Sequence, residues 1–165
     1  MAIKINRRRT DQDIRDLDEF LTYEDLQDFS GFMMWQLTHL WQRKINSEVG
    51  KVGLTYVQYV LLAALDWGLE NGVEPTQINL AKGTKLDKMM TSNVIRTLEK
   101  KGLVKRKKHP TDSRALLLSI TDKGYDILPK AIDIVEKFND SFFNKLGDDL
   151  PRFKKNMYEL LDKNL

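Results

Sequence analysis

The residues best suited to chemistry in this sequence are the cationic side chains of one segment, residues 82–114. The segment holds eleven Lys or Arg and three acidic residues, a formal charge of +8, whereas the rest of the chain carries −5. Charge segregated on this scale favours a polyanionic partner such as a nucleic acid. A single basic run is also common on an ordinary solvated surface, so the pattern of the neighbouring residues has to decide.

Residues 88–101 show the periodicity of an amphipathic helix. On a wheel of 100° per residue, the apolar arc that we expect to pack on the domain holds Met90, Thr91, Val94, Ile95 and Leu98. The opposite arc holds Lys88, Met89, Ser92, Asn93, Arg96 and Thr97. Ser, Asn and Arg carry the donors and acceptors that read base edges, and an exposed Met89 can touch a thymine methyl group. The alternative is an ordinary surface helix, which periodicity alone does not exclude.

Two short strands with basic residues follow this helix. Lys105–Lys108 can neutralise phosphates, Arg114 beyond the turn suits a narrow minor groove, and Asp112 is expected to shape the turn or aim an arginine. The residues that we predict to contact DNA are Lys85, Lys88, Met89, Ser92, Asn93, Arg96, Lys105, Arg106, Lys107, Lys108, His109, Asp112 and Arg114.

The elements that must position these residues can be predicted from patterning and caps. Helices are expected over residues 23–49, 54–68, 76–84, 85–102, 122–146 and 148–164, and strands over 103–108 and 115–120. Expected caps are Thr55, Thr76, Asp87 and Thr121, expected helix ends are Gly83 and Gly102, and Pro129 should kink the long helix. A short helix, a turn, a second helix and a hairpin form a winged helix-turn-helix, whose second helix enters the major groove. The predicted fold class is mainly α with a small β-hairpin wing.

The end segments predict an oligomer. Residues 1–22, with Arg7–Arg9, are expected to be a mobile basic arm, and 54–121 the DNA-binding region. The helices of 23–53 and 122–165 are rich in apolar residues, which indicates homodimerisation helices, although intramolecular packing is the alternative. Candidate residues for a ligand pocket at this junction are Trp35, His39, Trp41, Tyr56, Tyr59 and Trp67, although residues of this kind more often fill a core or an interface.

Composition excludes several other classes. The chain has no cysteine, two histidines and no apolar run long enough for a membrane span. Its start lacks a signal-peptide core, so a cytoplasmic protein without metal or cofactor is expected. The sequence contains no paired carboxylates in a recognisable motif, no Ser-His-Asp signature and no Gly-rich phosphate loop, so it does not predict an enzyme. A nuclease using the acidic residues between Asp11 and Glu19 is conceivable, but such runs are usually solvated faces.

The wing resembles that of the multiple-antibiotic-resistance regulator (MarR) family of bacterial transcription factors. The matching residues are Gly102-Leu103-Val104, Arg106, Asp112-Ser113-Arg114 and Thr121-Asp122-Lys123-Gly124. "LTYVQYVLLAAL", "TQINLAKGT" and "VIRTLEKKGLV" are similar to the helix-turn-helix segments of that family, and the resemblance covers residues 30–146.

The resemblance implies a homodimeric repressor of promoters that binds double-stranded DNA at a pseudo-palindrome. It implies base reading by Ser92 and Asn93, minor-groove contact by Arg114, and release by a small aromatic ligand such as an aromatic acid. The absence of cysteine excludes the peroxide-sensing branch. The alternative function is a winged-helix architectural or protein-interaction module that does not read bases.

Overall fold

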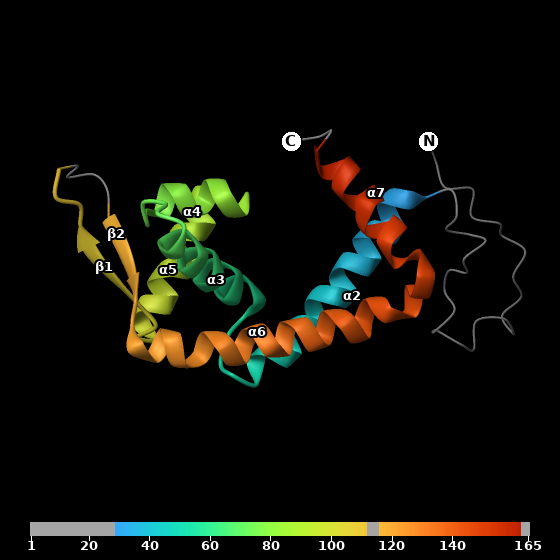
Figure 1. Ribbon diagram of the computed structural model, residues 1–165, viewed down its shortest axis with the longest axis horizontal. Coiled ribbons are helices and arrows are strands. Elements are labelled where there is room, and N and C mark those ends of the chain that lie inside the picture. Colours follow the sequence, from blue (N-terminus) through green and yellow to red (C-terminus); the bar gives the residue numbers. More distant parts are fainter. Residues whose placement is uncertain (1–28, 112–115, 163–165) are drawn as a thin grey trace, which may run out of the picture. The chain divides into compact units, whose positions relative to one another are not determined.

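The computed structural model of the chain describes residues 29–111 and 116–162 (Figure 1). The chain divides into two compact units, residues 1–41 and 42–165. Helix α2 begins in the first unit and ends in the second. The described helices are α2 (Ser30–Gly50), α3 (Tyr56–Glu70), α4 (Gln77–Thr84), α5 (Lys88–Lys100), α6 (Asp122–Phe143), the 3₁₀ helix η2 (Asn144–Asp149) and α7 (Leu150–Asp162), with strands β1 (Val104–Lys108) and β2 (Leu116–Ile120). This order confirms the winged helix-turn-helix predicted from the sequence.

Four helices begin at the caps that the sequence predicts. The Thr55 side chain accepts a hydrogen bond from the backbone N–H of Gln58, whose own side chain accepts from the N–H of Thr55, so α3 begins with a complete capping box. Thr76, Asp87 and Thr121 accept from backbone N–H groups in the first turns of α4, α5 and α6 in the same way. Local side-chain chemistry therefore fixes where α3, α4, α5 and α6 begin.

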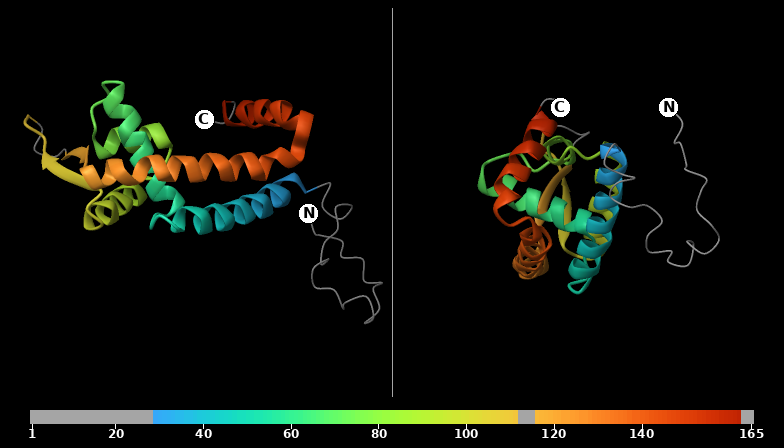
Figure 2. Two further views of the ribbon diagram at one scale, coloured as in Figure 1. Left: turned by 60° about the horizontal axis from the view of Figure 1, so that its bottom comes forward. Right: turned by 90° about the vertical axis from the view of Figure 1, so that its right-hand side faces the viewer.

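Several helix ends differ by a few residues from the expected ones, and two of these differences involve glycines. Gly83 was expected to end the short helix, but α4 continues to Thr84, and the left-handed residue that ends it is Lys85, with φ 58°. The long helix was expected to reach residue 146, but α6 ends at Phe143 and continues as η2, in which Gly147 (φ 49°) turns the chain. Pro129 lies inside α6, and Figure 2 shows α6 as one continuous helix, so the proline does not end it. The kink expected at Pro129 stays a prediction.

The wing is an antiparallel hairpin whose second strand also contacts the segment before α4. Val104 pairs with Ile120 and Lys108 with Leu116 at the two ends of the ladder. The backbone N–H of Leu118 donates to the carbonyl of Pro75 at 2.7 Å. The wing is therefore held by the protein backbone on both sides of β2. The turn that the sequence places between the strands includes residues 112–115, which lie outside the described residues.

The core of the second unit lies among α3, α4, α5, the hairpin and the start of α6. Its fully buried side chains include Leu61, Leu62, Leu65, Ile95, Leu98, Leu103 and Val104. In β2, Leu118 and Ile120 are buried and Ser119 is exposed, as the alternation of a half-buried strand requires. This single core joins the helix-turn-helix to the wing, so their mutual orientation depends on packing and not on a flexible link.

Candidate nucleic-acid interface

Helix α5 presents a polar face that no other described element covers. Thr91, Ile95 and Leu98 on its inner side are completely buried. On its outer side Lys88, Met89, Asn93 and Arg96 are exposed and Ser92 is half-buried, which agrees with the predicted arc. Met90 was expected on the inner side, and this prediction was wrong because its side chain is 43% exposed. Met90 lies in the first turn, where the helix begins to leave the core.

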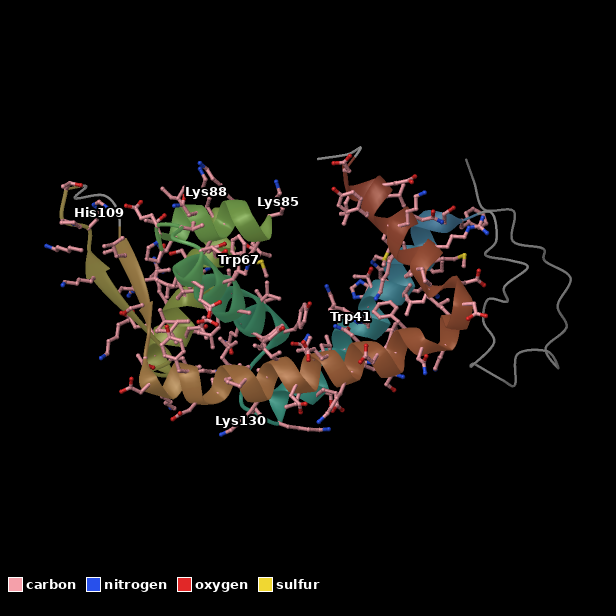
Figure 3. All side chains as sticks on the ribbon, in the orientation of Figure 1. Trp41, Trp67, Lys85, Lys88, His109 and Lys130 are labelled. Carbon is pink, nitrogen blue, oxygen red and sulfur yellow. The ribbon has the colours of Figure 1, made fainter. Side chains whose placement is uncertain are left out.

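The turn between α4 and α5 adds cations to the same side of the domain. Lys85 and Lys88 flank this turn, and Figure 3 shows both side chains on the side of the second unit away from α6. Both residues are exposed. The carboxylate of Asp87 between them accepts from the N–H groups of Met89 and Met90 at 2.8 and 3.1 Å. Asp87 therefore caps the start of α5, and its negative charge interacts with the N-terminus of that helix. Lys85 and Lys88 can then bind a polyanion.

The basic residues of β1 divide into two groups by strand alternation. Lys105 and Lys107 are exposed and share one face of the strand, opposite to the face of buried Val104. Arg106 lies on the inner face and is half-buried. Its guanidinium forms an ion pair with Glu99 near the end of α5, with Nε 2.7 Å from Oε2. Lys105 and Lys107 are therefore placed to neutralise phosphates, whereas Arg106 is directed toward α5.

The Glu99–Arg106 pair fixes the wing against α5. The hydrogen bond from Arg106 lowers the pKa of the Glu99 carboxyl below its ordinary value, and the same contact raises the pKa of Arg106. Glu99 is one of only three acids in the basic segment, which is a signal that sequence reasoning could have used to find the pair. Because Arg106 is held this way, its expected phosphate contact stays a prediction, and positioning of the wing is the role that its geometry supports.

Replacing Glu99 with glutamine should remove a small, pH-dependent part of the free energy of unfolding. A carboxyl group whose folded pKa is lowered contributes stability above its unfolded pKa, and that stability is lost as the pH falls through the folded value. The variant should therefore unfold at lower denaturant concentration than wild type at pH 7. The difference should shrink as the pH falls through the lowered pKa of Glu99, and the two proteins should converge only below that pKa, where the carboxyl is protonated in the folded protein as well. Denaturant titrations at pH 7 and over a series of acidic pH values check this, and a pH-independent difference would contradict it.

His109 connects the wing to the segment before α4. Its Nε2 lies 2.7 Å from Oε1 of Glu74, and its Nδ1 accepts a hydrogen bond from the backbone N–H of Thr111 at 3.2 Å. Because Nδ1 is an acceptor, Nε2 carries the proton and donates to the carboxylate. Only 13% of the His109 side chain is exposed. The structure therefore places His109 in the wing with a structural partner, and its predicted DNA contact remains untested.

The side chains of two further residues connect the elements around α5, and the sequence did not predict either connection. The ammonium of Lys101 donates to the carbonyl of Gly53 and to Oε1 of Gln58 at 2.6 and 2.7 Å. The hydroxyl of Thr121 donates to the carbonyl of Gly102 at 2.7 Å. These contacts join the end of α5 to the start of α3 and the start of α6. Partners so far apart in the sequence leave no local signal.

The predicted ligand residues fall into separate groups. In the first unit, the rings of Trp35 and His39 lie edge to face with centroids 4.4 Å apart, and both residues are exposed. In the second unit, Tyr56 and Tyr59 lie 5.8 Å apart at the start of α3, and burial raises the pKa of both phenols. Trp67, near the end of α3, lines a pocket between α3 and α4, and none of the other five candidate residues lines that pocket. Trp41 ends the first unit.

Some of the predicted features lie outside the described residues. They are Asp112, Arg114, the predicted basic arm of residues 1–22, and residues 23–28. Within residues 29–111 and 116–162, no three His, Cys, Asp or Glu side chains gather as a metal site would require. None of the helices in these ranges combines the length and apolar character needed to cross a membrane.

Comparisons with known proteins agree with this arrangement. The sequence model of the MarR family matches residues 54–116. The HTH-type transcriptional regulator YdcH of Bacillus subtilis, itself uncharacterised, is 43% identical over 113 residues, which are 68% of this chain and 77% of that protein.

Solved structures show the same fold. The MepR–DNA complex of S. aureus matches with a TM-score of 0.73 at 21% identity, covering 87% of this chain and 98% of that one. The organohalide-sensing regulator RdhR, solved with 2,4-dichlorophenol bound, matches with a TM-score of 0.73 at 19% identity, covering 90% and 85%. Together with the identity to YdcH and the family match, the winged helix-turn-helix shows that the chain belongs to the MarR family of transcriptional regulators.

Proposed function

We propose that this regulator is a homodimer that binds a pseudo-palindromic operator in double-stranded DNA and represses the adjacent promoter. The observation that carries the proposal is the outer face of α5, where Asn93 and Arg96 are exposed between cations. Helices of this kind enter the major groove, where amide and guanidinium groups read base edges. A DNA-bound relative of the same fold, MepR, supports this use of the domain.

The side chains divide into base-reading and phosphate-binding groups. Ser92 and Asn93 read bases, with Met89 beside them to contact a thymine methyl group. The guanidinium of Arg96 lies on the same face as this pair and can also reach a base edge. The phosphate-binding group comprises Lys85, Lys88, Lys105, Lys107 and Lys108. Arg114 enters the minor groove. Arg106, His109 and Asp112 orient the wing.

Replacing Lys107 with alanine should weaken binding to all DNA sequences by the same factor. Lys107 is exposed on the outer face of β1, so its contribution comes from neutralising one phosphate and releasing its counterions. The slope of log K against log salt should fall by about one unit. Fluorescence anisotropy on two unrelated duplexes between 0.05 and 0.2 M salt measures both quantities. A change in preference between the duplexes would contradict a phosphate contact.

The dimer is proposed from apolar side chains that the single chain leaves exposed. In the first unit these are Phe29, Phe32, Met33, Met34, Trp35, Leu37 and Leu40, and on α7 they are Met157, Tyr158, Leu160 and Leu161. Apolar surface of this extent is unusual on a monomer and marks an interaction site. We assign residues 23–53 and 122–165 to dimerisation and residues 54–121 to DNA binding. Of the residues for which the sequence predicts a ligand pocket, Trp35, His39 and Trp41 lie in the first of these dimerisation regions. The dichlorophenol-bound relative supports a small aromatic effector.

Stoichiometry tests this proposal. The full-length protein should sediment as two chains without DNA, and two chains should bind each duplex of an operator recovered from genomic DNA of the source organism. Protection from DNase should cover two half-sites about one helical turn apart. One chain per duplex would contradict the dimeric mode. A protein of this kind acts where chromosomal DNA lies, in the cytoplasm, and acts by binding without catalysis.

A further inference from the structure

A pocket of about 240 Å³ lies in the second unit between the end of α3 and α4. Its apolar lining includes Leu65, Trp67, Val73, Pro75 and Leu80. The indole of Trp67 is 62% exposed, and Figure 3 shows this side chain beside α4, well apart from the hairpin residue His109. Ligand pockets are mostly apolar and usually larger than 300 Å³. This pocket therefore suits one aromatic ring with a short substituent.

Two polar side chains line the pocket, those of Asn79 and Glu74. Asn79 donates its side-chain N–H to the backbone carbonyl of Glu74 at 3.0 Å. One carboxylate oxygen of Glu74 lies 2.7 Å from Nε2 of His109. Among the described residues that line the pocket Glu74 is the one charged residue, and none is Lys, Arg or His. This charge favours a ligand that brings hydrogen-bond donors and a positive charge.

Glu74 belongs to the pocket and to the support of the wing at once. Its carboxylate binds His109 of the wing at 2.7 Å. The next residue, Pro75, accepts from the N–H of Leu118 in β2, and Thr76 forms a bridge with Leu117. A cation bound to the Glu74 carboxylate competes with the hydrogen bond from His109. A ligand in the pocket can therefore affect the hairpin through Glu74.

We propose that this pocket binds a small arylalkylammonium ion, with its ring against Trp67 and its ammonium on Glu74, and that binding loosens the wing at His109. The site differs from the predicted junction pocket, since Trp67 alone is shared with that set. Any effect on DNA binding rests on the proposed function, whereas ligand binding itself does not.

The first test is a titration of the full-length, ¹⁵N-labelled protein without DNA. The chain has three tryptophans, and the indole N–H signal of Trp67 is identified by its loss in Trp67→Phe. 2-Phenylethylammonium should shift that signal saturably and also shift the imidazole signals of His109. It should bind at least about tenfold more tightly than 3-phenylpropionate, which has a similar shape and the opposite charge. Equal binding of the two probes would overturn the proposal.

Variants locate the site and separate its parts. Gly83 lines the pocket and a Cβ there meets no atom within 4 Å, so Gly83→Leu should fill the pocket and abolish binding. Trp67→Ala, at an exposed residue, should also abolish it and serves if Gly83→Leu fails to fold. Glu74→Gln should keep the ring site but lose the preference for the cation. Unchanged binding in any of these variants would overturn the assignment.

A last measurement separates this proposal from the proposed function. The ammonium probe should lower the affinity of the wild-type protein for its recovered operator and leave that of Trp67→Ala unchanged. If the probe binds but the protein recognises no DNA sequence, the proposed function fails while the pocket stands. If DNA binding is specific and the Trp67 signal does not shift, the pocket assignment fails alone.

Discussion

Replacing Gly124 with alanine is expected to destabilise the folded protein by about 3 kcal/mol. Gly124 is buried in the first turn of α6. A Cβ there would collide with the backbone carbonyl oxygen of Leu103 and lie 2.6 Å from Cγ2 of Ile120. The carbonyl belongs to the backbone that leads into β1, so it cannot rotate away like the end of a flexible side chain. Either α6 or the hairpin must shift.

Gly83→Ala is the matched control for Gly124→Ala. Gly83 is also helical, but a Cβ there meets no atom within 4 Å, so alanine should stabilise the protein by about 0.5 kcal/mol through helix propensity. Urea unfolding at one fixed protein concentration compares the two, because the stability of a dimer depends on concentration. Equal stability of Gly124→Ala and wild type would show that α6 and the hairpin are not held as closely as the structure indicates.

Replacing Asn93 with alanine is expected to weaken binding to the operator by about 1–3 kcal/mol and to relax sequence preference at one position of each half-site. Asn93 is exposed near the middle of α5, where its amide can form two hydrogen bonds with a base edge. The loss should appear with the operator and be nearly absent with unrelated DNA. Lys107→Ala should show the opposite pattern, a uniform loss.

Asn144→Ala is the control for this substitution. It makes the same chemical change at an exposed residue of η2, outside the proposed interface, and should leave affinity and preference unchanged. Competition titrations of the operator against single-position variants give the preference for each protein. If Asn93→Ala weakens binding to every duplex equally, Asn93 contacts the backbone, and the assignment of α5 as the base-reading helix loses its main support.

Local chemistry made much of the fold predictable. Thr55, Thr76, Asp87 and Thr121 were identified as caps because a short oxygen-bearing side chain before an apolar-periodic run satisfies free N–H groups. The end of α4 was placed at Gly83 because glycine tolerates positive φ most easily. In the structure Lys85 adopts that conformation, since the turn into α5 requires it two residues later.

The candidate site was predictable in its residues but not in its contacts. The wheel for residues 88–101 separated buried Ile95 and Leu98 from exposed Asn93 and Arg96 correctly. It misplaced Met90, because a wheel gives direction around a helix but not where the core ends along it. Strand patterning gave the charge of β1 but not the pairing of Arg106 with Glu99. Long-range partners such as Glu74 and His109 depend on tertiary packing alone.

The central claim is sequence-specific binding by α5, and selection of bound fragments from sheared genomic DNA of the source organism tests it most directly. The purified full-length protein is used at about 0.15 M salt, because this salt concentration suppresses purely electrostatic retention of DNA. We expect the recovered fragments to share a pseudo-palindrome with half-sites about ten base pairs apart, and Asn93→Ala to recover it with a degenerate position in each half-site. Fragments that share no sequence would contradict the claim and favour an architectural winged-helix protein.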